Sequence, residues 1–135
     1  MSARSRLRDE RGASAVEFAF IVPVLLLLVL GIAEFGRAFQ VQGTISAAAR
    51  EGVRMMALQN DLPAAKAAVQ NAAGSLDPGI GLDQITVDPP SGCTGATGAS
   101  GQTVELTIEY DMPFLTDFFG AGLTLTGTGV MRCNG

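Results

Sequence analysis

A run of apolar residues from Ala13 to Ala33 is the feature that most constrains this 135-residue chain. As an α-helix, its 21 residues would be about 31 Å long, which matches the hydrocarbon thickness of a bilayer. Pro23 lies inside the run, and membrane helices tolerate proline because neighbouring groups satisfy the freed carbonyl. We therefore predict a transmembrane helix over residues 13–33.

The charges on either side of this run predict its orientation. Residues 1–12 contain four arginines and two carboxylates, a net charge of +2, whereas the whole chain carries −4 and the remainder therefore −6. A basic segment before a span keeps the N-terminus in the cytoplasm, so we expect a cytoplasmic leader over 1–12 and an extracytoplasmic domain over 34–135. The acidic remainder argues against nucleic acid as a partner, since phosphate binding needs clustered Lys and Arg.

The helical pattern continues beyond the span. Apolar residues recur three to four positions apart, or at sums of these spacings, at Phe35, Phe39, Ile45, Ala49, Val53 and Met56. We predict one helix from near Ser14 to near Leu58, about 67 Å long. Its continuation over 34–58 is amphipathic and would receive a packed domain on one face.

The remaining residues predict a second helix and three strands. Asp61 as N-cap and Pro63 in the first turn favour a short helix over 62–75. The strand patterns cover residues 84–87, 102–110 and 123–131. In the second strand, the residues expected on the buried face are Val104, Leu106, Ile108 and Tyr110.

The third strand alternates less strongly because of its glycines, and residues 91–101 form a polar Gly/Ser/Thr segment typical of a loop. A sheet with one buried face needs a cover, and the amphipathic helix offers one. We expect an α+β, pilin-like fold, with the long N-terminal helix packed on a small antiparallel sheet.

Two cysteines, Cys93 and Cys133, lie far downstream of the apolar run. If this part of the chain is exported, they can pair in an oxidising compartment, and we favour a disulfide over two unpaired thiols. A bridge closing a loop of about 40 residues would contribute on the order of 4 kcal/mol in the chain-entropy model.

The sequence offers no catalytic, cofactor-binding or metal site. There is no histidine, which excludes imidazole catalysis and most zinc sites. Glu105 and Glu109 would share the solvent face of one strand, which is more typical of a hydrated face than of an acid/base pair. No glycine-rich phosphate loop or metal-ligand spacing occurs. We predict that the protein is not an enzyme and needs no cofactor.

Glu17 is the most informative single position. A carboxylate a few residues into a spanning helix costs roughly 2.5–3.5 kcal/mol, so something should compensate it. Alternatively, Glu17 lies at the membrane surface, or the span starts after it. A late start would leave Phe18 to Ala33, about 24 Å, which is short for a span.

Several segments carry a resemblance to a known family. Residues 11–18, Arg-Gly-Ala-Ser-Ala-Val-Glu-Phe, resemble the processing site of prepilin-type proteins, in which a membrane aspartic peptidase cuts after the glycine. Residues 17–19 with the leucine-rich run, then 31–37 and 48–54, resemble the TadE-like proteins, which are pseudopilins of the tight-adherence (Tad/Flp) pilus system. The closing strands, from Val104 to Arg132, are similar to that family's terminal strands. The resemblance covers most of the chain and is least distinctive over 59–101.

This resemblance implies a processing site at Gly12 and Ala13 and an assembly motif at Glu17 and Phe18. Cleavage would remove the basic leader, and the new amine on Ala13 would pair with Glu17 of a neighbouring subunit. The implied partners are a prepilin peptidase, other pseudopilins, pilus-assembly membrane proteins and the lipid bilayer. Because Phe rather than Tyr follows Glu17 and a folded domain follows the span, the resemblance implies a minor pseudopilin. It would lie in the bacterial inner membrane and support assembly of an adhesive pilus.

The alternative is a secreted or bitopic binding domain behind an ordinary signal anchor. Gly31, Ile32 and Ala33 offer small residues where a leader peptidase would cut. Against it, the apolar run is longer than a typical signal core and helical periodicity crosses that site. A mature N-terminus at Ala13 would support the pilin interpretation, and one at Glu34 would support secretion.

Overall fold

Helix α1 spans Ala3–Gln59 and runs through both of the units into which the chain divides, residues 1–36 and 37–135. The computed structural model describes residues 3–93 and 101–133, and for residues 3–9 it describes the backbone alone. Most of the predicted polar loop over 91–101 therefore lies outside the described residues, as do the first two residues of the predicted leader.

The first unit consists of the N-terminal part of α1. The helix begins at Ala3, eleven residues before the expected start near Ser14. The residues before Ser14 contain no proline, and extending an existing helix requires no new nucleation. The predicted start was therefore too late, because a change in hydropathy does not by itself end a helix.

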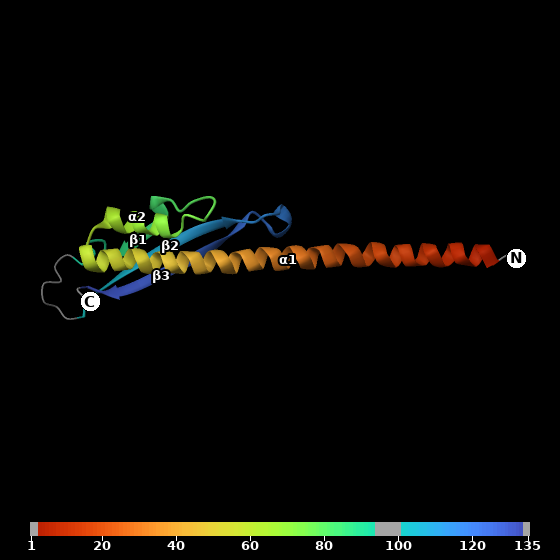
Figure 1. Ribbon diagram of the computed structural model, residues 1–135, viewed down its shortest axis with the longest axis horizontal. Coiled ribbons are helices and arrows are strands. Elements are labelled where there is room, and N and C mark those ends of the chain that lie inside the picture. The colour runs from red at the N-terminus through yellow and green to blue at the C-terminus, as the bar shows by residue number, and fades with distance from the viewer. Residues whose placement is uncertain (1–2, 94–100, 134–135) are drawn as a thin grey trace. The chain divides into compact units, whose positions relative to one another are not determined.

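The second unit combines the rest of α1 with a second helix and a sheet (Figure 1). Within the described residues the sheet has three antiparallel strands in the order β1-β2-β3. The elements after α1 are α2 (Leu62–Ala72), η1 (Leu82–Gln84), β1 (Ile85–Asp88), β2 (Thr103–Pro113), η2 (Asp117–Phe119) and β3 (Gly122–Arg132). The predicted α+β class, a long apolar helix on a small antiparallel sheet, is confirmed.

Strand β2 lies in the middle of the sheet and supplies much of its buried face. Val104, Leu106, Ile108 and Tyr110 are at most 1% exposed, so the face predicted from alternation is the one that packs. Burying a side chain of this size stabilises the fold by about 1.5–3 kcal/mol. The intervening residues of β2 point away from the core.

The buried face of α1 differs from the predicted one toward the start of the second unit. Ala38 and Val41 are buried there, whereas Phe39 is 78% exposed. Phe35, in the first unit, is also exposed. The spacing explains the difference, because positions 38 and 41 continue the face of Ile45 at intervals of three and four. Position 39 is six residues from Ile45 and falls about 120° away.

Two glycines of β3 let the backbone of α1 lie directly on the sheet. A Cβ added at Gly127 would be 2.9 Å from the carbonyl oxygen of Ile45, and one added at Gly129 would be 2.6 Å from that of Ala49. These contacts are to helix backbone, which cannot move aside as a side chain can. The glycines that weakened the strand pattern are therefore required by the packing.

Tyr110 ties the loop after α2 to the core. Its hydroxyl donates a hydrogen bond of 2.7 Å to the carbonyl oxygen of Pro78. Burial raises the pKa of Tyr110 above its ordinary value of 10.0; the Arg37 guanidinium opposes this rise and the Asp77 carboxylate adds to it. The side chain therefore stays a neutral donor.

We expect Gly129→Ala to lower the free energy of unfolding by about 1–3 kcal/mol, because the new methyl group meets helix backbone. Thr128→Ala is the matched control. Thr128 is exposed on the opposite face of the same strand, and its loss should cost less than about 1 kcal/mol. The measurement is thermal unfolding of the full chain in detergent, followed by the near-ultraviolet signal of Tyr110, the single tyrosine. Equal stability of the two variants would contradict a close helix–strand contact.

Candidate functional site

The bond between Gly12 and Ala13 lies inside helix α1, not in an extended segment. Both residues are exposed, and a Cβ added at Gly12 would meet nothing within 4 Å. Packing within the chain therefore does not require a glycine at this position. Glycine lowers the local stability of a helix by about 1 kcal/mol relative to alanine, so Gly12 marks a point where α1 is easier to unwind.

Glu17 and Phe18 follow on the next turn of the same helix. Ala13 and Glu17 are four residues apart in α1, so they lie on one face, one turn above the other. Glu17 is exposed and Phe18 is 69% exposed. Removal of the leader would thus leave an amine and a carboxylate on adjacent turns at the head of an apolar helix.

The apolar run that follows is uncovered by the rest of the chain. The most apolar stretch of this helix is not buried at all within the chain. Within the described residues, α1 is the helix that is long and apolar enough to cross a membrane. Exposed large side chains occur at Val16, Phe18, Phe20, Ile21, Val24, Leu25, Leu26, Leu27, Leu28, Val29 and Ile32. A continuous apolar surface of this extent needs lipid or other helices around it, which is consistent with membrane anchoring.

The family model described as TadE-like protein matches residues 12–54. The TadE-like segment begins at the expected cleavage bond, contains the whole apolar run and ends on the part of α1 that packs on the sheet. It confirms the resemblance over this range. No curated protein and no solved structure matches the chain.

The two cysteines lie downstream of the TadE-like segment. The sulfur atoms of Cys93 and Cys133 are bonded at 1.99 Å, and their Cα atoms are 5.6 Å apart, within the usual range for a disulfide. The bridge joins the segment after β1 to the end of β3. The backbone N–H of Cys93 also donates to Oδ1 of Asn60 at 2.7 Å, which holds this segment against the end of α1.

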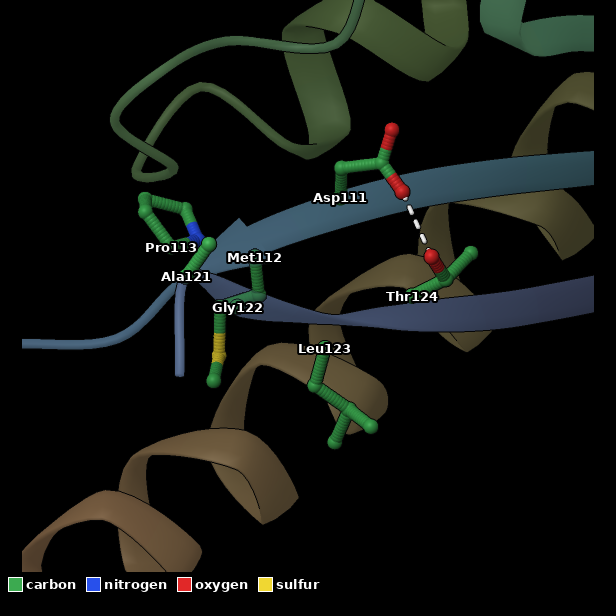
Figure 2. A pocket seen from close by; sticks show the side chains of 7 residues that line it. All are labelled: Asp111, Met112, Pro113, Ala121, Gly122, Leu123 and Thr124. Carbon is green, nitrogen blue, oxygen red and sulfur yellow. Dashed lines mark hydrogen bonds between the residues drawn. The ribbon is translucent and has the colours of Figure 1, made fainter. Parts of the chain in front are cut away.

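A hollow of about 300 Å³ lies at the end of the β2–β3 hairpin, lined by residues 111–113 and 121–124. Figure 2 shows Asp111 and Thr124 on neighbouring strands, with the Thr124 hydroxyl donating to Oδ1 of Asp111 at 2.6 Å. Within residues 10–93 and 101–133, no group of three or more His, Cys, Asp or Glu side chains could hold a metal ion. The lining of the hollow therefore combines the apolar side chains of Met112, Pro113 and Leu123 with one hydrogen-bonded carboxylate.

The loop that joins β2 to β3, residues 114–121, was missed from the sequence. Leu115, Phe118 and Phe119 are 64%, 71% and 43% exposed. Phe114 is half-buried against the core and meets Phe119 edge-on, with ring centroids 6.5 Å apart. The available signal was composition, because four large apolar residues in eight are unusual for a loop between strands.

We expect the Cys93→Ser/Cys133→Ser double variant to lose about 4 kcal/mol of stability, since the bridge spans 40 residues. Denaturant unfolding of the full chain in detergent measures the loss, and the reduced wild-type protein is the control that should match it. Thiol labelling of the protein from cells should find no free cysteine. Identical unfolding of the oxidised and reduced forms would contradict a stabilising bridge.

Proposed function

We propose that the protein is a minor pseudopilin of a tight-adherence pilus, anchored in the bacterial inner membrane by residues 13–33. The basic leader faces the cytoplasm and the domain of residues 34–135 faces outward. The match of a TadE-like family model to residues 12–54 supports an association with this pilus system. A structural role in assembly, rather than catalysis, agrees with that family.

Glu17 is the observation that carries the proposal. It is exposed in a helix whose following surface is apolar, so an inserted Glu17 would need a compensating charge. Cleavage after Gly12 would supply one as the amine of Ala13. Because Ala13 and Glu17 are one helical turn apart, the amine of one copy can meet the carboxylate of another only if the two helices are offset along their axes by about 6 Å. The pair would thus set the register between subunits.

The peptidase step is supported by the surroundings of Gly12. A bulkier side chain there would meet nothing in the fold, so packing does not explain the glycine, and its place five residues before Glu17 favours a role in processing. The partners we propose are a prepilin peptidase, further pseudopilins and pilus-assembly membrane proteins.

The alternative, an ordinary signal anchor cut after Ala33, is less well supported. Helix α1 continues without a break at both candidate bonds, after Gly12 and after Ala33, so helix continuity does not separate the two interpretations. The family match separates them, because cleavage after Ala33 would remove about half of the TadE-like segment, Glu17 included, whereas cleavage after Gly12 would remove only its first residue.

Gly12→Leu should abolish peptidase-dependent shortening of the chain, because a large side chain blocks entry of the backbone into the peptidase. Gly36→Leu is the matched control, as it also places leucine at an exposed, uncrowded glycine of α1. N-terminal sequencing with and without the peptidase should give Ala13 for the wild type and for Gly36→Leu. A mature N-terminus at Glu34, or an intact leader in all strains, would overturn the processing step.

Glu17→Gln should still be inserted and cleaved but should reduce pilus number and surface attachment, because the neutral amide removes the charge pair while keeping the size. Glu10→Gln is the control, since it removes an exposed carboxylate from the leader. Pili are counted by electron microscopy, and attachment is measured in the same strains. Normal pili in a Glu17→Gln strain whose chain is correctly cleaved would refute the assembly role without touching the processing step.

A further inference from the structure

We propose that the β2–β3 loop, residues 114–121, is a second membrane contact that inserts its apolar side chains into the outer surface of the bilayer. The proposal rests on the anchoring of residues 13–33 proposed above and adds a separate lipid-binding element in the second unit. The occupant is the boundary between lipid headgroups and acyl chains.

The loop carries exposed apolar side chains on a backbone with a defined conformation. Leu115 and Phe118 are among the most exposed large apolar side chains of the second unit, at 64% and 71%. The loop does not collapse on itself, because η2 holds Phe118 and Phe119 on one short turn with ring centroids 6.4 Å apart. The N–H of Phe114 donates to the carbonyl oxygen of Ala121 at 3.3 Å and closes the base of the loop.

A hydrogen bond fixes this loop beside the residue at which the second unit begins. Nη1 of Arg37 donates to the carbonyl oxygen of Pro113 at 2.6 Å. Arg37 follows Ala33, the end of the predicted span, by four residues, or about 6 Å of helix. The separation of Arg37 from Ala33 is set by the helix, and the hydrogen bond that places the loop beside Arg37 lies within the second unit.

The packing of the β2–β3 hairpin on α1 also directs the end of the hairpin toward the start of the second unit. From Ala49 to Ile45 to Gln42, the contacts of α1 move along β3 from Gly129 to Thr126, whose carbonyl oxygen accepts from Nε2 of Gln42 at 2.8 Å. The strand rises about 3.3 Å per residue against 1.5 Å for the helix, so it advances faster than α1 does. The loop therefore lies at the end of the second unit from which the chain continues into the span (Figure 1).

The polar groups of this region limit the depth of insertion. Asp117 is exposed between Thr116 and Phe118, and a carboxylate is costly in hydrocarbon. Phe and Leu with a charged neighbour suit the interface, where rings enter the acyl boundary and the charge stays wet. The half-exposed Arg37 would face lipid phosphates at the same level.

A bilayer fits this loop better than a protein partner does. An inserted span brings lipid to within a few residues of Arg37 in every copy of the protein that is anchored in the bilayer. A protein partner would have to occupy the same layer and displace that lipid. The loop also presents backbone already paired at its base, so it offers no free strand for pairing.

The test places one tryptophan at a time in a chain that has none. Full-length Phe118→Trp, Val24→Trp and Leu58→Trp are each reconstituted in phosphatidylcholine vesicles with acyl chains that are unlabelled, brominated near the headgroup, or brominated near the chain end. The three native side chains are similarly exposed, at 71%, 64% and 58%. Position 58 lies 21 residues beyond Arg37, about 32 Å along the helix. Bromine quenches tryptophan only at short range, so we expect strong quenching at 118 by bromine near the headgroup, strong quenching at 24 by bromine near the chain end, and none at 58 by either.

The outcomes separate this proposal from the one on which it rests. Quenching at Val24→Trp with none at Phe118→Trp overturns the loop contact but leaves the anchor, and then assigns the exposed rings to a protein partner. No quenching at Val24→Trp overturns both. Leu115→Trp repeats the measurement if Phe118→Trp fails to form its disulfide, and must be quenched like Phe118→Trp for the proposal to stand.

Discussion

The contact between the backbone of α1 and the glycine positions of β3 is the interaction on which the second unit depends. Because Gly127 and Gly129 have no side chains, helix and strand approach more closely than a normal helix–sheet pair. Gly52 extends this packing to α2 and β2, since a Cβ there would lie 2.5 Å from Cγ2 of Val69 and 2.8 Å from Cδ1 of Leu106. A small domain is thus packed closely at these points because side chains are absent where the backbones meet.

Helix α1 has different surroundings in the two units, although the same helical period runs through both. In the second unit α1 buries a face that includes Ala38, Val41 and Ile45, whereas the apolar run of the first unit is exposed all round. A helix that buries one stripe and exposes the rest is stabilised by its partner sheet, and a helix that is apolar all round requires lipid or other helices. The family match crosses from one regime to the other, ending at Arg54. The segment of this chain that resembles the family therefore lies within the helix.

The sequence predicted those parts of the fold that a local period controls. The buried face of β2 and the three strands came from alternation, and the long N-terminal helix came from its apolar run and the helical spacing that follows it. Phe39 was assigned to the wrong face because an apolar residue six positions from Ile45 still fits a loose three-to-four pattern, and only the sheet decides which face is covered. The start of α1 was placed late because it was set where the apolar run begins, and a change in hydropathy does not by itself end a helix. The loop over 114–121 was missed because its proposed role depends on a neighbour that is distant in the sequence. Arg37 lies beside the loop, although it is 76 residues away from Pro113.

The glycines show why both packing and sequence position are needed to interpret the candidate site. Gly52, Gly127 and Gly129 are crowded, so packing accounts for them fully. Gly12 and Gly36 are exposed in a helix interior with open space around them, where glycine only costs stability. Open surroundings alone do not assign a role, since these two glycines share them. Gly12 is distinguished by a carboxylate five residues later at the head of an exposed apolar helix. That combination is costly in a bilayer unless cleavage creates a positive charge beside it.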